Sequence, residues 1–229
     1  MAAVEPTLDA LLAAQSVWRA ARTPQALAPG LATGHAALDA LLPQHGWPRG
    51  ALVELLLPVD GVGELSLLLP LLARLTRAGD TVALVAPPYV PYAPAWQAAG
   101  VDLRRLEIVD ADPRGALWAF EQCLRSSACA AVLGWPRGDA AALRRLQVAA
   151  DAGGSLGIAL RDRRHAANPS PAALRLECSA EPGTAPAWHV RKCRGAQPPR
   201  QPFVAAWPPP VAQARAAPLR TPARAAPAQ

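Results

Sequence analysis

Residues 48–70 read PRGALVELLLPVDGVGELSLLLP and combine three features in a row. The apolar run at 51–57 predicts a buried strand, a turn with two glycines follows it, and 64–78 has the leucine spacing of an amphipathic helix. A buried strand, a glycine turn and a helix in this order are typical of a phosphate-binding P-loop. The stretch therefore predicts an α/β fold, and it raises the question of whether the turn holds a nucleotide.

The turn contains Asp60, Gly61, Gly63, Glu64 and Ser66. A working P-loop needs glycines whose backbone N–H groups bind phosphate, a lysine for the β- and γ-phosphates, and a hydroxyl group for Mg²⁺. Here Glu64 stands in place of the lysine, and each close contact between like charges costs roughly 4 kcal/mol at an effective dielectric constant of about 20. The helix dipole supplies only about half a positive charge, so it does not offset this cost. The sequence predicts a degenerate P-loop and no cofactor.

Two other strand ends lack the acidic residues that an ATPase uses. The strand predicted at 130–134 runs into Gly134-Trp135-Pro136-Arg137, where a Walker B aspartate would be expected. The strand predicted at 81–86 is followed by Pro87-Pro88-Tyr89, where a water-activating glutamate would be expected. No nucleophile or metal-binding motif occurs elsewhere in the chain. We therefore predict a protein that is not an enzyme, with no catalytic and no metal-binding residues.

Outward from the opening stretch, strand-like and helix-like runs alternate. The predicted strands are 51–57, 81–86, 106–111, 130–134 and 156–160, and the predicted helices are 36–42, 64–78, 93–99, 114–126 and 140–152. Asp139 is placed to cap the last helix, and Gly153-Gly154 is placed to end it. Apolar strands alternating with helices predict a mainly parallel sheet covered by helices. Two further strands, 174–179 and 187–192, have no helix between them and predict an antiparallel extension at the sheet edge.

Charge divides the 229 residues unevenly. All 17 acidic residues lie at or before Glu181, whereas only basic charges follow Glu181. The basic residues from 191 onward are Arg191, Lys192, Arg194, Arg200, Arg215, Arg220 and Arg224. We expect an N-terminal helix and linker at 1–34, a core domain at 35–195, and a disordered, basic tail rich in Pro and Ala at 196–229.

Three apolar residues interrupt this tail. Phe203, Val204 and Trp207 either form a docking motif or pack back on the domain, and the pattern leaves both alternatives open. Phe203, Trp207 and the seven basic residues are the candidate contacts for a partner protein or, through weak electrostatic attraction, for nucleic acid. The N-terminal helix, which begins after Thr7, is open in the same way: it packs on its own domain or on another subunit.

The cysteines and the apolar segments bear on the cellular compartment. Cys123, Cys129, Cys178 and Cys193 have no spacing typical of a metal site or a disulfide framework, so we expect reduced thiols in a cytoplasm. The longest apolar stretch, 65–73, is too short to cross a bilayer, and no contact with a membrane is expected.

Several motifs in fixed order resemble known proteins. ATGHAALDALLPQHGWPRGALVELLLP at 32–58 and PYAPAWQAAGVDLRRLEIVDADPRGALWAFEQCLRSSACAAVLGW at 91–135 resemble the RecA core. The segments GWPRGALVELLL, APPYVPYAP and RRLQ resemble the RecA/SulA-like family of translesion-synthesis-associated proteins called ImuA. The resemblance covers about residues 30–195. It implies a RecA-like P-loop NTPase-type core with a degenerate nucleotide site.

The resemblance also implies a function in SOS mutagenesis after DNA damage. Its expected partners are a catalytically inactive Y-family polymerase-like protein called ImuB and an error-prone C-family DNA polymerase, with RecA as a further contact. The Walker lysine, the Walker B acid and the catalytic glutamate are all absent, so ATP-driven strand exchange is not expected. The alternative is a SulA-like inhibitor of cell division that acts on FtsZ, because SulA has the same degenerate core. The basic tail and the N-terminal extension fit ImuA better.

Overall fold

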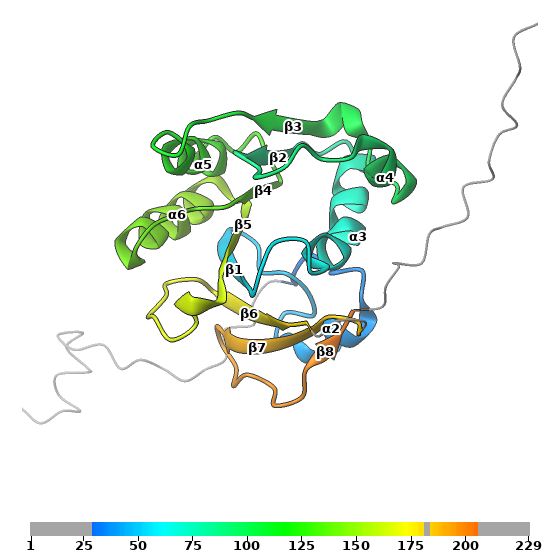
Figure 1. Ribbon diagram of the computed structural model, residues 1–229, viewed down its shortest axis with the longest axis vertical. Helices are drawn as coiled ribbons and strands as arrows, with labels where there is room; N and C mark the ends of the chain where they lie inside the picture. Colours follow the sequence, from blue (N-terminus) through cyan, green and yellow to red (C-terminus); the bar gives the residue numbers. More distant parts are fainter. Residues whose placement is uncertain (1–28, 181–183, 206–229) are drawn as a thin grey trace, which may run out of the picture.

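Strands and helices alternate along most of the chain (Figure 1). The computed structural model describes residues 29–180 and 184–205. The strands are β1 (Ala51–Leu57), β2 (Val82–Val85), β3 (Leu106–Val109), β4 (Ala131–Gly134), β5 (Leu156–Asp162), β6 (Leu174–Ser179), β7 (Ala187–Cys193) and β8 (Phe203–Val204). The helices are α2 (Ala36–Leu41), α3 (Glu64–Arg77), α4 (Ala93–Ala98), α5 (Ala116–Arg125) and α6 (Ala140–Gly153), with 3₁₀ turns η1 (Leu103–Arg105) and η2 (Arg163–His165).

All the described strands belong to one sheet, in the order β3-β2-β4-β5-β1-β6-β7-β8. The strands from β3 to β6 are parallel to their neighbours, whereas β7 and β8 pair antiparallel. This confirms the predicted α/β fold with a mainly parallel sheet. The antiparallel part begins one strand later than predicted, because β6 pairs with β1 in parallel before the chain turns back into β7.

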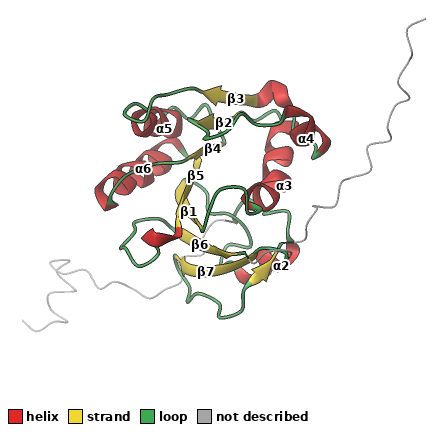
Figure 2. Cartoon of the chain, in the orientation of Figure 1, coloured by secondary structure: helices red, strands yellow, loops and turns green. Residues whose placement is uncertain are grey.

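Helices cover both faces of the parallel part of the sheet, with α3 and α4 on one face and α5 and α6 on the other (Figure 2). Strand β1 contributes to both cores: Val53, Leu55 and Leu57 pack on the side of α3, and Leu52 packs on the side of α5 and α6. Every residue of β1 is buried, which explains why its sequence is a continuous apolar run rather than an alternating one.

Local signals mark the ends of α6 as the sequence predicts. The Asp139 side chain accepts a hydrogen bond of 2.9 Å from the Ala142 N–H, which caps the first turn. Gly154 ends the helix with φ of 67°, a left-handed conformation that costs little without a Cβ atom. No helix in the described ranges is long and apolar enough to cross a membrane.

The folded region extends beyond the predicted core boundaries of 35 and 195 on both sides. The backbones of Leu31 and Trp47 pair through hydrogen bonds of 2.8 and 2.7 Å, so the chain joins the fold before residue 35. At the other end, β8 pairs with β7, and Phe203 is 6% exposed. Of the two alternatives for Phe203, packing back on the domain is the one observed. The predicted N-terminal helix and residues 206–229 lie outside the described residues.

Candidate functional site

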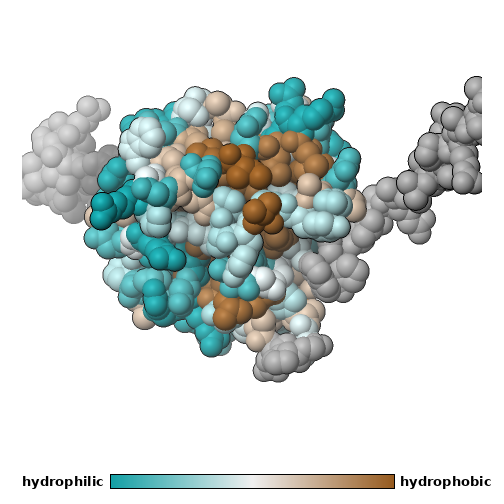
Figure 3. Space-filling model, turned by 45° about the horizontal axis from the view of Figure 1, so that its top comes forward, coloured by the Kyte–Doolittle hydropathy of each residue, from teal (hydrophilic) through white to brown (hydrophobic). Residues whose placement is uncertain are grey.

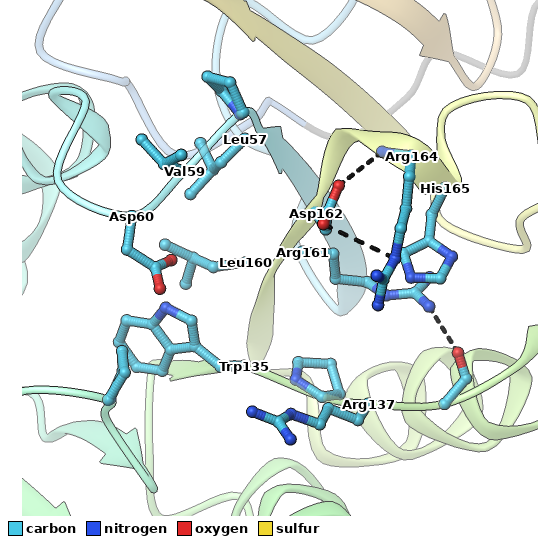
Figure 4. A pocket seen from close by; sticks show the side chains of 14 residues that line it. Leu57, Val59, Asp60, Trp135, Arg137, Leu160, Arg161, Asp162, Arg164 and His165 are labelled. Atoms are coloured by element: carbon cyan, nitrogen blue, oxygen red, sulfur yellow. Dashed lines mark hydrogen bonds and ion pairs between the residues drawn. The ribbon is translucent and has the colours of Figure 1, made fainter.

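A pocket of about 580 Å³ opens at the carboxyl ends of β1, β4 and β5 (Figure 4). In open α/β sheets this is the edge where ligands bind, and the volume falls within the range of small-ligand sites. Its walls are formed by Leu57, Pro58, Val59, Asp60, Pro88, Trp135, Pro136, Arg137, Gly138, Leu160, Arg161, Asp162, Arg164 and His165. The pocket therefore contains one end of the glycine turn and residues from two distant strand ends.

Charges around the pocket are nearly balanced. The Arg164 guanidinium lies 3.6 Å from the Asp162 carboxylate, and Arg161 is engaged by a buried glutamate described below. Among the described residues, Arg137 and Asp60 have no ion-pair partner, and both are exposed. Burial, together with the charges of Arg161 and Arg164, lowers the pKa of His165. The free charges at the pocket are thus one guanidinium and one carboxylate.

Beneath the pocket, a fully buried carboxylate lies between two arginines. Glu54 in β1 accepts a 2.9 Å hydrogen bond from Nη1 of Arg161 in β5. Its other oxygen lies 2.7 Å from Nε of Arg175, the residue directly opposite on β6, although that N–H is not aligned for a hydrogen bond. One negative charge thus faces two positive charges in a site without water access. Such a group is stable only if the remaining donors find acceptors.

Backbone carbonyl groups supply those acceptors. Arg161 donates to the carbonyl of Gly138. Arg175 donates to the carbonyl groups of His165, Ala166 and Asn168 at 2.9 to 3.1 Å. Lys192 extends the set with a 2.7 Å hydrogen bond to the Ser170 carbonyl, and desolvation by burial lowers its pKa. These basic side chains fix the loops that form one wall of the pocket.

The glycine turn is closed by a side chain of its own. Gly61 and Gly63 have φ of 84° and 103°, which a residue with a Cβ atom rarely adopts. Glu64, the first residue of α3, folds back so that Oε1 accepts a 2.8 Å hydrogen bond from the Gly61 N–H. Pro186 packs against the outside of the turn, since a Cβ atom on Gly63 would lie 2.8 Å from its Cγ. A carboxylate thus occupies a backbone donor that an anion would otherwise use.

The other polar residues of the turn are arranged differently from one another. The Ser66 hydroxyl is fully buried, so it does not face the pocket, whereas Asp60 lines it. Glu64 is 5% exposed and lies near the Cys178 thiol of β6. Burial and, to a lesser degree, the Glu64 charge raise the pKa of Cys178 to about 11. Of the five residues predicted for the turn, Asp60 is the one at the pocket.

The candidate contact residues near the C-terminus fall into three groups. Arg194 and Arg200 are exposed, and Arg191 is exposed but lies 2.9 Å from Glu177 in an ion pair. Lys192 supports the loop at Ser170, and Phe203 is buried against the His35 ring at a centroid distance of 5.3 Å. Four of the predicted contacts lie outside the described residues: Trp207, Arg215, Arg220 and Arg224.

Sequence reasoning missed the buried cluster of Glu54, Arg161 and Arg175. Its signal is Glu54 itself, a charged residue within an otherwise apolar strand, but its two partners lie more than 100 residues further along the chain. It also missed Trp135, whose indole N–H is buried and has no acceptor within the described ranges. No group of three His, Cys, Asp or Glu side chains among the residues that the structure describes is arranged to hold a metal ion.

Comparisons with known proteins give one informative match. No protein-family model matches the chain, and neither does any curated protein sequence. Among solved structures, SulA from Pseudomonas aeruginosa matches with 29% sequence identity and a TM-score of 0.40. The match covers 47% of this chain and 97% of that one. A TM-score at this level is too low to carry an argument about function.

Proposed function

We propose that this protein is a non-catalytic adaptor in damage-induced translesion DNA synthesis, built on a RecA-like core that has lost its nucleotide site. The observation that carries the proposal is the position of Glu64. Its carboxylate accepts the Gly61 N–H at 2.8 Å, so a phosphate would have to displace a buried negative charge and would be repelled by it. A turn arranged in this way supports binding functions rather than ATP hydrolysis.

The resemblance to the ImuA family supplies the biological context. It covers about residues 30–195, which coincide with most of the folded region. The strand, turn and helix at β1 and α3 keep the layout of a P-loop while its chemistry is replaced. The proposed partners are the inactive Y-family polymerase-like protein and the C-family polymerase of that system, with RecA as a further contact.

The exposed basic residues are the proposed contact surface. Arg194 and Arg200 lie on the surface of the core, and the remaining candidates follow in the segment after Ala205. Phe203 does not belong to this surface, because its side chain is buried between β7 and α2. The tail should therefore be tested from residue 206 onward and not from residue 196.

The test is a pull-down of the polymerase-like partner with the full chain and with a chain that ends at Ala205. We expect truncation to weaken binding about tenfold, a loss of about 1.4 kcal/mol. A full-length variant with Arg215→Gln, Arg220→Gln and Arg224→Gln separates the charge of the tail from its length. Unchanged affinity in both proteins would remove the tail from the proposal. Filamentous growth on expression without DNA damage would favour a cell-division inhibitor instead.

A second measurement addresses nucleotide chemistry directly. A ligand at one hundred times its dissociation constant stabilises the folded state by about 2.7 kcal/mol, so thermal unfolding detects binding sensitively. We expect saturating Mg-ATP to leave the melting temperature unchanged. ATP turnover that disappears on substitution of Gly63 or Ser66 would overturn the assignment as a non-enzyme.

A further inference from the structure

The described chain ends at the same edge of the sheet as the pocket. Strand β8 is antiparallel to β7, which is antiparallel to β6, so β8 runs in the direction of β1 and both end at the carboxyl edge. The Ala205 N–H donates to the Pro186 carbonyl at 3.3 Å, and Pro186 packs against Gly63 in the glycine turn. Two residues of the same turn, Val59 and Asp60, line the pocket.

The next residues of the sequence are Ala206-Trp207-Pro208-Pro209-Pro210. Consecutive prolines have φ restricted to about −65° and favour a polyproline II helix, which leaves its carbonyl groups without internal hydrogen bonds. This stretch carries no charge, and the first basic residue after it is Arg215. It is therefore an apolar segment with unpaired hydrogen-bond acceptors.

The pocket has the complementary chemistry. Pro58, Pro88 and Pro136 provide apolar walls, and Trp135 provides an aromatic one. The buried indole N–H of Trp135 has no acceptor among the described residues, and in Figure 4 its nitrogen faces the Asp60 carboxylate across the pocket. Proline-rich segments dock on aromatic-lined grooves, where unpaired donors meet their carbonyl groups. The balanced charges of the lining favour an uncharged occupant over an anion.

Distance permits the contact. Three strand spacings separate β8 from β1, which is about 14 Å at roughly 4.8 Å per strand. At about 3.1 Å per residue, residues 207–210 reach about 6 to 16 Å from Ala205. We propose that the pocket is a recognition site for a polyproline II segment and that its occupant is residues 207–210 of the same chain. This proposal does not depend on any partner protein.

Hydrogen–deuterium exchange of the full-length protein tests the contact. The test variant replaces Trp207, Pro208, Pro209 and Pro210 by serine, and the matched control replaces Pro218, Pro222 and Pro227 by serine. In the test variant we expect backbone amides at 59–62 and 137–138 to exchange several-fold faster than in the wild type, because the pocket loses its cover. In the control variant they should exchange at the wild-type rate.

A pocket variant completes the experiment. Val59 is 63% exposed, so Val59→Asp should leave the fold intact while placing a charge where the apolar segment packs. Faster exchange at 137–138 in this variant as well would support the assignment. Equal rates in the wild type and the serine variant would overturn it. Protection that increases with protein concentration would overturn the intramolecular occupant, because the segment would then come from a second copy of the chain.

Discussion

At the scale of single residues, Glu54 has the largest energetic role that the structure reveals. It is fully buried and neutralises Arg161 and Arg175, which are themselves almost entirely buried. Replacing it by glutamine keeps the size of the side chain but leaves two buried guanidinium groups without a counter-charge. We expect Glu54→Gln to lower the free energy of unfolding by about 3 to 5 kcal/mol, measured by urea denaturation.

A surface ion pair provides the matched control. Glu177 pairs with Arg191, whose side chain is 53% exposed, so solvent screens the interaction. Glu177→Gln removes the same charge and should lower the free energy of unfolding by less than about 1 kcal/mol. Equal effects of the two substitutions would contradict the role assigned to Glu54.

Cys178 links stability to alkaline pH. The pKa of its thiol is about 11 in the folded protein, against a model value of 9.0. Between these values the folded state keeps a proton that the unfolded state has lost, so this contribution to stability is complete below about pH 9 and is lost as the pH rises to 11. We expect Cys178→Ala to show a shallower loss of unfolding free energy than the wild type between pH 9 and 11.

The partly exposed Cys123 is the comparison for this measurement, since the two thiols differ in burial. Slopes against pH are compared rather than absolute values, because removing a buried side chain also leaves a cavity. A slope in Cys178→Ala that equals the wild-type slope would show that other groups cause the alkaline loss.

At the scale of elements, local patterns predict most of the fold. The buried run of β1 and the capped helix α6 are recognisable because their signals lie within the segments themselves. Strand β8 was not predicted, since its two residues lie in a proline-rich stretch whose composition resembles a disordered tail. Its pairing depends on β7 and on the ring of His35, which are contacts that composition does not encode.

The two residues of β8 face opposite sides and allow a direct test. Phe203 is 6% exposed and packs against His35, whereas Val204 is 55% exposed. We expect Phe203→Ala to lower the free energy of unfolding by about 3 kcal/mol, and Val204→Ala by less than about 1 kcal/mol. Chemical denaturation of both variants measures the difference. Similar small effects would show that residues 203–205 contribute little to the core.

At the scale of the whole molecule, the pocket illustrates what sequence order conceals. Its lining comes from 57–60, 135–138 and 160–165, which the sheet order β4-β5-β1 brings together. The glycine turn and its missing lysine were predictable, because they form one continuous stretch. The partner of Glu64 within the turn, the unpaired Trp135 and the balance of charges were not predictable, because they depend on how separate strand ends meet.

The same view limits how the C-terminal end binds nucleic acid. Arg191 is neutralised by Glu177, and Lys192 donates to the Ser170 carbonyl, so two of the seven basic residues are already engaged. The five that remain are Arg194, Arg200, Arg215, Arg220 and Arg224. Each phosphate contact with single-stranded DNA contributes about −0.7 to the slope of log K against log salt concentration. Five contacts therefore give a slope no steeper than about −3.5, whereas seven would give about −4.9.

Fluorescence anisotropy of a labelled oligothymidine across a salt series measures this slope. Arg194→Gln should reduce its magnitude by about 0.7, and ending the chain at Ala205 should reduce it to about 1.4, because only two free cations remain. Arg191→Gln removes the same charge from an ion pair and should leave the slope unchanged. A wild-type slope near −5 would mean that Arg191 and Lys192 leave their partners to contact DNA. The ion pair with Glu177 and the support of the loop at Ser170 would then be reversible parts of the surface.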